Sequence, residues 1–116
     1  MKYMLLMYAN ESIDLSTPEA QEAVAQPVWF ALMEEMKAAG VLLSNNGLAP
    51  IATATTVRVR EGNTLITDGP FAETHEQLGG FFLLECKDLD EALRWAEKIP
   101  HAKYGSVEVR PLWSEV

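Results

Sequence analysis

The stretch KYMLLMY, residues Lys2 to Tyr8, is apolar at almost every position and contains only seven residues. Buried helices usually run for ten residues or more, so an apolar run of this length favours a strand. Side chains along a strand point alternately to its two faces. Because both alternating sets are apolar here, we expect a central strand that is covered on both faces.

The segments around this strand predict an alternation of strands and helices. Thr17 and Pro18 can begin a helix that ends at Gly40, and Pro27 inside it should kink or split it. Asp88 begins a second helix, in a variant of the capping box with Glu91. Further strands are predicted at 41–45, 55–61, 64–67, 80–87 and 105–113, and those at 55–61 and 64–67 form a hairpin.

The order β-α-β, hairpin, β-α-β predicts a fold of the α+β class. Two βαβ units that share one antiparallel sheet form the ferredoxin-like arrangement, with both helices on one face. The strand GFFLLECK (residues 80–87) is also apolar on both faces. Since a large bare apolar patch is unfavourable on a monomer, we expect a homodimer in which the sheet of one copy covers that of the other.

Length, net charge and cysteine content restrict the classes of protein to which this chain can belong. The 116 residues suit a single domain, 1–116, with one core. A formal charge of −8 disfavours nucleic acid and anionic membranes as partners. The chain has one cysteine and no apolar run of membrane-spanning length, so we expect a cytoplasmic protein without disulfides. No nucleotide fingerprint or metal-ligand cluster appears, and we expect neither cofactor nor metal.

A fourteen-residue motif, TDGPFAETHEQLGG (residues 67–80), carries most of the candidate chemistry. Asp68 follows a predicted strand, and sites are commonly built where strand ends project into loops. We therefore take Asp68 and His75 as candidate catalytic residues that would act as base or acid. The candidate substrate-binding residues are Phe71, Glu73, Glu76 and two arginines that share a strand face and could hold an anion, Arg58 and Arg60.

Each of these residues also has a purely structural interpretation. The segment 68–70 has the chemistry of a turn, in which glycine supplies a positive φ and proline fixes the next φ. Phe71 suits a core or interface anchor, and the glutamates and His75 suit a solvated surface. We expect His101, which follows a proline after the second helix, to be solvated, and Cys86 to be buried as a small apolar residue.

The segment DGPFAETHEQLGGFFLLE, with ATATTVRVREGNTLIT before it and DLDEALRWAEKIP and GSVEVRP after it, resembles the YCII-related domain family. The motif is similar to the branch of that family with a DGPF-A-E-T-K-E signature. The resemblance covers essentially the whole chain and implies a dimeric α/β barrel of ferredoxin-like halves. YCII proteins are suggested to carry a His–Asp dyad. His75 stands where the signature has lysine, and the first half of the chain contains no histidine, so only Asp68 carries over.

Two functions are open at this point. The first is a cofactor-independent enzyme acting on a small aromatic or lactone-like molecule, since the wider superfamily contains such enzymes. The second is a non-catalytic ligand-binding or regulatory partner, because members of this branch often occur beside extracytoplasmic-function sigma factors. The acidic surface is compatible with binding a basic protein segment.

Overall fold

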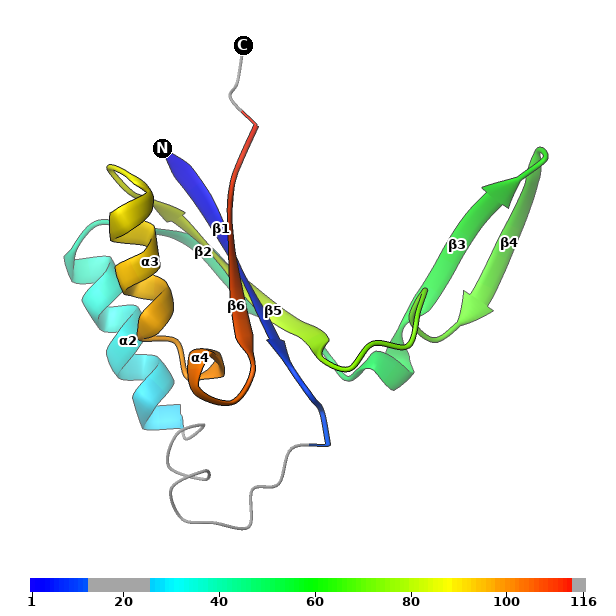
Figure 1. Ribbon diagram of the computed structural model, residues 1–116, viewed down its shortest axis with the longest axis horizontal. Coiled ribbons are helices and arrows are strands. Elements are labelled where there is room, and N and C mark those ends of the chain that lie inside the picture. The colour runs from blue at the N-terminus through cyan, green and yellow to red at the C-terminus, as the bar shows by residue number, and fades with distance from the viewer. Residues whose placement is uncertain (13–25, 114–116) are drawn as a thin grey trace.

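A four-stranded antiparallel sheet forms the body of the protein (Figure 1). The computed structural model describes residues 1–12 and 26–113. The strand order is β2-β5-β1-β6. The strands are β1 (Lys2–Ala9), β2 (Leu42–Gly47), β5 (Gln77–Glu85) and β6 (Ser106–Pro111). The two strands with apolar residues on both faces, β1 and β5, are therefore the central pair.

The helices lie on one face of this sheet (Figure 1). They are α2 (Gln26–Ala38), α3 (Leu89–Glu97) and a short α4 (His101–Tyr104), and a 3-10 turn, η1 (Ile51–Thr53), follows β2. None of the helices in the described ranges is long and apolar enough to cross a membrane. The fold is α+β with an antiparallel sheet, as the sequence predicted.

The core fills the space between the sheet and the helices. Leu5 of β1 and Leu84 of β5 are fully buried, and they pack with Met36 of α2 and Ala92 of α3. Cys86, directly after β5, is 2% exposed, as predicted. The alternate side chains of the central strands point to the opposite face and are only partly buried: Met4, Leu6, Phe81 and Leu83. Within one chain, helices cover only one of the two apolar faces.

The ends of the helices follow the predicted capping chemistry. Gly40 has φ 72°, and the N–H groups of Gly40 and Val41 donate to carbonyls in the last turn of α2. Asp88 caps α3 by accepting a hydrogen bond from the Glu91 N–H, 2.9 Å long. The Glu91 carboxylate accepts from the N–H of Lys87, one residue before the position expected for a capping box.

Pro27 is the second residue of the described part of α2. The predicted helix start at Thr17 and Pro18 is outside the described residues, so the predicted kink or break at Pro27 stays a prediction.

The predicted hairpin forms a separate two-stranded sheet that stands away from the body (Figure 1). Its strands are β3 (Thr55–Arg60) and β4 (Asn63–Asp68). The tip residues Glu61 and Gly62 have φ 52° and 79°, which is the geometry of a type I′ turn. We call residues 55–68 the arm. It projects on the side of the four-stranded sheet that the helices leave open.

Candidate functional site

The two predicted catalytic residues lie at the base of the arm. Asp68 is the last residue of β4, opposite Thr55, and His75 lies in the connection from the arm to β5. Both side chains are exposed. Neither lines either of the two cavities described below.

Three hydrogen bonds connect the motif to β3 and to Ala54, the residue before it. The Gly69 N–H donates to the Ala54 carbonyl over 2.6 Å, and the Thr56 hydroxyl donates to the Gly69 carbonyl over 2.8 Å. An Arg58 guanidinium nitrogen donates to the Phe71 carbonyl over 2.9 Å. Gly69 has φ 99°, a conformation that favours glycine. These contacts support the interpretation of residues 68–70 as a turn that positions the arm.

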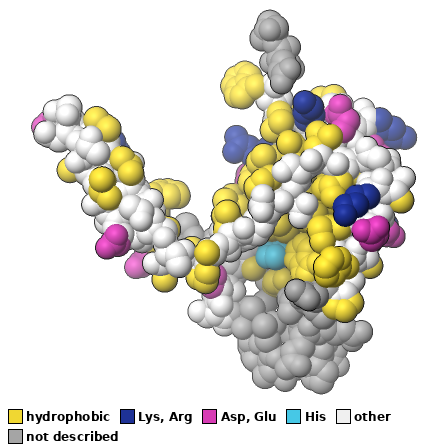
Figure 2. Space-filling model, turned by 180° about the vertical axis from the view of Figure 1, so that it is seen from behind, with side chains coloured by type: hydrophobic (Ala, Val, Ile, Leu, Met, Phe, Trp, Pro, Cys, Tyr) yellow, Lys and Arg dark blue, Asp and Glu magenta, His cyan; other side chains and the backbone are white. Residues whose placement is uncertain are grey.

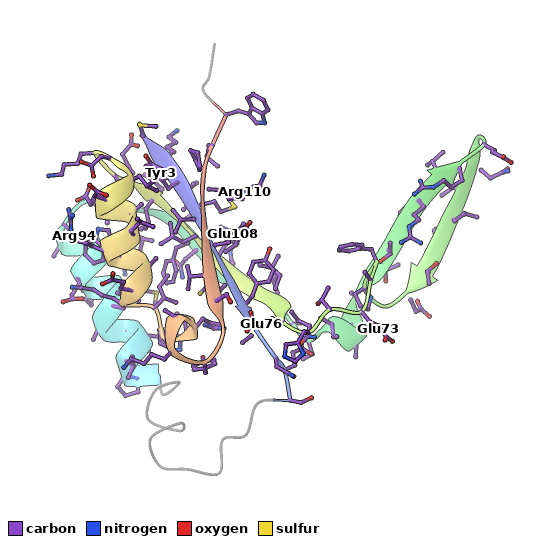
Figure 3. The ribbon with its side chains drawn as sticks, viewed as in Figure 1. Tyr3, Glu73, Glu76, Arg94, Glu108 and Arg110 are labelled. Carbon is purple, nitrogen blue, oxygen red and sulfur yellow. The ribbon has the colours of Figure 1, made fainter. Side chains whose placement is uncertain are left out.

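The predicted substrate-binding residues are spread along the arm and its return to the sheet, where Figure 3 labels Glu73 and Glu76. Phe71 is 72% exposed, and Glu73 is exposed as well. Glu76 is partly buried and accepts a 2.7 Å hydrogen bond from the Ser106 hydroxyl. Arg60 donates to the carbonyl of its neighbour Val59. The structure does not gather these groups around one cavity.

A cavity of about 240 Å³ lies instead at the end of the sheet where β2 and β5 pair, next to α2 and α4. Its lining is mostly apolar and aromatic, with an imidazole and two amides as its polar side chains. The lining residues are Met7, Trp29, Met33, Asn45, Asn46, Gly47, Gly79, Phe81, Phe82 and His101. Such a combination of apolar walls and few polar groups is typical of small-molecule sites.

His101 is held in this cavity by aromatic rings. Its ring centroid is 5.7 Å from that of Trp29, in an edge-on arrangement, and 5.3 Å from that of Tyr104. Trp29 in turn stacks on Phe82 of β5, with ring centroids 6.2 Å apart. The imidazole is therefore fixed between α2 and α4, and our expectation that His101 is solvated was wrong. Packing of α4 against the sheet end, rather than the local sequence, partly buries the imidazole and shields its Nδ1 atom.

Burial also sets the protonation state of this histidine. It lowers the pKa of His101 below its ordinary value of 6.5, because a desolvated imidazolium is unfavourable. Its Nδ1 atom is buried and has no hydrogen-bond partner among the described residues. A neutral imidazole with a free nitrogen is a competent proton acceptor.

Two glycines at the start of β5 lie next to the imidazole and to strand β2. A Cβ atom added at Gly79 would lie 3.7 Å from His101 Nε2, in ordinary van der Waals contact. A Cβ added at Gly80 would lie 2.6 Å from the Asn46 carbonyl oxygen, which is too close for a stable contact. The chain is closely packed at the start of β5, where Gly79 borders the cavity and Gly80 fits against β2.

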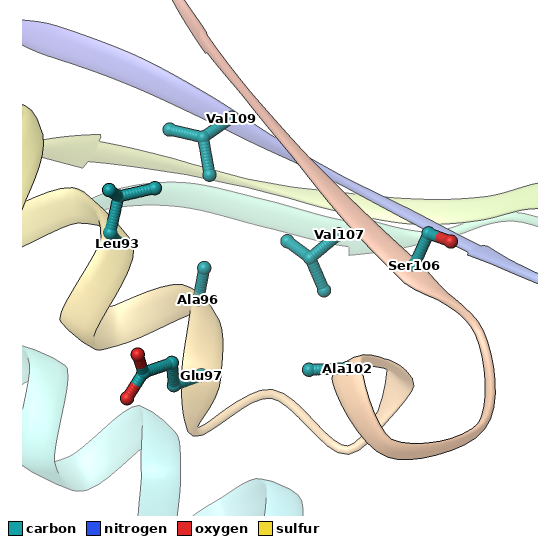
Figure 4. A pocket seen from close by; sticks show the side chains of 7 residues that line it. All are labelled: Leu93, Ala96, Glu97, Ala102, Ser106, Val107 and Val109. Atoms are coloured by element: carbon teal, nitrogen blue, oxygen red, sulfur yellow. The ribbon is translucent and has the colours of Figure 1, made fainter.

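A second cavity, of about 300 Å³, lies between α3, α4 and β6 (Figure 4). Its lining is largely small and apolar, with Glu97 as its one ionisable side chain: Leu93, Ala96, Glu97, Ala102, Ser106, Val107 and Val109. It offers little for acid–base chemistry. Among residues 1–12 and 26–113, no three His, Cys, Asp or Glu side chains are grouped as a metal site needs.

Comparison with known proteins gives the family. The YCII-related domain matches residues 1–115. The chain belongs to the YCII-related domain family. An uncharacterized protein of Rhizobium meliloti (strain 1021) is 40% identical to this YCII-related domain over 114 residues, which cover 97% of this chain and 92% of the relative.

A solved structure shares the fold of this YCII-related domain. It is 5-chloro-2-hydroxyhydroquinone dehydrochlorinase from Burkholderia phenoliruptrix AC1100, in complex with 2,5-dihydroxybenzoquinone. The TM-score is 0.53 with 14% sequence identity, and the match covers 99% of this chain and 96% of that one. At this identity the likeness shows a common fold.

Sequence reasoning missed His101 because the motif drew attention to the other histidine. The only local signal at His101 is the preceding Pro100, which marks the end of a helix. Its neighbour in space, Trp29, belongs to a distant helix. No spacing rule connects that helix with the segment after α3.

Proposed function

We propose that this YCII-related domain is an enzyme that binds a small single-ring organic molecule and transfers a proton with His101 as the base. One observation carries the proposal: His101, a partly buried imidazole that desolvation keeps neutral and whose Nδ1 has no partner among the described residues, lines an apolar, aromatic cavity. A buried polar atom without a partner is uncommon and often marks a functional site. The reaction needs no cofactor, because His101 accepts the proton and can return it to the product.

The size and lining of the cavity favour a flat ring as substrate. Its volume of about 240 Å³ is below the roughly 300–1,000 Å³ of typical ligand pockets, so the ligand is small. Trp29, which is partly buried and lines the cavity, offers a ring surface on which an aromatic or quinone-like ring packs well. The likeness in fold to a dehydrochlorinase bound to 2,5-dihydroxybenzoquinone supports a substrate of this class.

Asn45 is the natural partner for charge that develops on the substrate. Among the described residues its side-chain amide donates to the Met33 sulfur, over 3.4 Å, and sulfur is a weak acceptor. When a C–H or O–H group of the ring loses its proton to His101, negative charge moves onto a ring oxygen. The Asn45 amide can exchange its weak bond for one to that oxygen, which stabilises the anion.

We also propose that the sheet is one ferredoxin-like half of a dimeric barrel. The order β2-β5-β1-β6, with α2 before β2 and α3 before β6, corresponds to two interleaved βαβ units. The face that carries Met4, Leu6, Phe81 and Leu83 has no helix over it (Figure 1). The sheet of a second copy is the cover that the fold suggests.

Titration with 2,5-dihydroxybenzoquinone tests the proposed site. We expect binding by wild type, at least tenfold weaker binding by His101→Gln, and loss of binding by Gly79→Ala, whose added methyl group would lie beside His101 Nε2. His75→Gln is the matched control, since that histidine is exposed outside the cavity. Binding that is unchanged in both His101→Gln and Gly79→Ala would place the ligand elsewhere and contradict the proposal.

A further inference from the structure

The arm has an apolar face that no other residue in the described ranges, 1–12 and 26–113, covers. Val57 pairs with Ile66 in the β3–β4 register, and Val59 lies two residues further along the same face. These three side chains are 60%, 69% and 59% exposed. Hydrophobic side chains on the arm are visible in Figure 2, where it stands apart from the body. An apolar face of this kind marks a contact surface.

The arm also lacks support from its own body. Among the described elements, β3 and β4 pair with each other, and none of the extensive contacts joins either strand to the four-stranded sheet. The radius of gyration is 16.4 Å, whereas a compact chain of this length has about 13 Å. An isolated two-stranded hairpin is at best marginally stable in water. The arm therefore needs a surface that its own chain does not supply.

The open face of the sheet and the arm lie on the same side of the molecule (Figure 1). A body that covers Met4, Leu6, Phe81 and Leu83 would occupy the side toward which the arm projects. A second copy of this chain would both cover the open sheet face and support the arm. Under two-fold symmetry each copy contributes one arm and one open face, and the assembly closes without unused surfaces.

Charge also favours a second copy as the partner of the arm. Arg58 and Arg60 balance Glu61 and Asp68, so the arm is formally neutral and the rest of the chain carries the whole charge of −8. A neutral arm can approach an acidic body without the repulsion between two acidic bodies, and its two arginines lie on the face opposite Val57 and Val59.

We propose that the β3–β4 arm of each copy reaches across the dimer and packs its apolar face, Val57, Val59 and Ile66, on the body of the other copy. The inference rests on the two-copy assembly proposed above and assigns the arm its partner. It also gives the motif at 67–80 a mechanical role. The turn at Gly69 and its bonds to Ala54 and Thr56 fix the angle at which the arm leaves the body.

A mixed-copy NMR experiment tests the arm contact directly. A spin label is attached to Asn63→Cys at the tip of the arm, and this protein is mixed with ¹⁵N-labelled wild type. The native Cys86 does not interfere, because it is 2% exposed and burial raises the pKa of its thiol. We expect the label to broaden amide signals of β1 or β6 in the other copy. A dimer without such broadening would refute the arm contact and leave the dimer standing, and a monomer would refute both.

Substitution on the arm provides a second test. Ile66→Asp should raise the dimer dissociation constant at least tenfold in sedimentation, whereas Ile66→Val should change it little. Ile66 is 69% exposed in the single chain, so the charged substitution leaves the fold of each copy intact and the circular dichroism spectrum unchanged. A dissociation constant that is the same for Ile66→Asp and wild type would overturn the inference.

Discussion

At the scale of single residues, His101 makes stability depend on pH. Its folded-state pKa lies below the ordinary value of 6.5, so below that pH the unfolded chain binds a proton that the folded chain resists. The stability that the neutral imidazole contributes is present above pH 6.5. It is lost as the pH falls from about 6.5 toward the folded pKa.

We therefore expect wild type to lose more stability than His101→Gln between pH 7 and pH 5, measured as the free energy of unfolding in urea. The comparison removes the contribution of the carboxylates, which both proteins share. His75→Gln leaves His101 as the one histidine, and NMR titration of that variant should give a pKa below 6.5. Equal pH profiles for wild type and His101→Gln would show that this imidazole is not desolvated.

A substitution at Asp68 distinguishes a site at the base of the arm from the site at the His101 cavity. Asp68→Asn keeps the shape of the side chain and removes its charge. We expect it to bind 2,5-dihydroxybenzoquinone as wild type does, because Asp68 is exposed and does not line the His101 cavity. Loss of binding in Asp68→Asn, with a normal thermal unfolding curve, would instead place the site at the base of the arm.

Gly69 is expected to matter for stability. Its φ of 99° strains any residue with a Cβ atom, so Gly69→Ala should lower the free energy of unfolding by about 1 kcal/mol or more. Gly47→Ala is a suitable control, because Gly47 has no positive φ and its added Cβ would have no neighbour nearer than 3.9 Å. Thermal unfolding of the two variants measures the difference, and equal midpoints would show that the turn tolerates a side chain.

At the scale of elements, the junction of β5 with the edge strand β2 is the tightest contact near the cavity. A Cβ added at Gly80 would lie 3.1 Å from the Gly47 Cα and closer still to the Asn46 carbonyl, both backbone atoms. Backbone cannot yield as a flexible side chain does. The two strands must separate or shift if Gly80 is replaced.

Gly80→Ala should destabilise the protein by about 1–3 kcal/mol, as overpacking of a close contact does. Gly79→Ala, one residue earlier, should cost much less, since its added Cβ makes only ordinary contacts. Urea unfolding of both variants provides the measurement. If Gly80→Ala proved as stable as Gly79→Ala, β2 would have to pack more loosely on β5 than the structure indicates.

At the scale of the whole molecule, the two faces of β5 predict opposite consequences for neighbouring substitutions. Leu84 is fully buried against the helices, whereas Leu83 points to the open face and is partly exposed. We expect Leu84→Asp to unfold the chain, because an unpaired buried carboxylate costs several kcal/mol. Leu83→Asp should leave a folded monomer in place of the dimer that we propose for wild type.

Sedimentation and circular dichroism together distinguish these outcomes. Sedimentation at micromolar concentration should give a dimer mass for wild type and a monomer mass for Leu83→Asp, with native secondary structure in both. A wild-type monomer would contradict the covered sheet face, and a dimeric Leu83→Asp would place the interface on another surface.

Much of the fold could be predicted because its signals are local. The alternation in KYMLLMY and GFFLL depends only on neighbouring residues, and so do the type I′ turn at Glu61 and Gly62 and the cap at Asp88. Boundaries moved by a few residues: β5 begins at Gln77, before the predicted start at Gly80. Gly80 pairs with Met7 and with Gly47, where there is no room for a side chain, and Gly79 lies at the irregularity in the pairing of β5 with β1.

The candidate site was less accessible to sequence reasoning. The motif at 67–80 is conspicuous in the sequence. In the structure its hydrogen bonds connect the base of the arm, and Asp68 and His75 are exposed. His101 belongs to no sequence motif. Its interest as a site residue comes from its contact with the Trp29 ring and from its position next to Gly79. Residues so far apart in the chain produce no periodicity that a single sequence can show.

The sequence by itself determined which strands are central, where the helices end and that one apolar sheet face exceeds what two helices can cover. These properties follow from side-chain alternation, backbone preference and hydrophobicity, which act over a few residues. The partial burial of His101 beside Trp29 and the projection of β3 and β4 as an arm became known from the folded structure. The desolvation of a side chain and the exposure of an apolar surface both depend on which distant segments pack together. Such packing is a property of the whole chain.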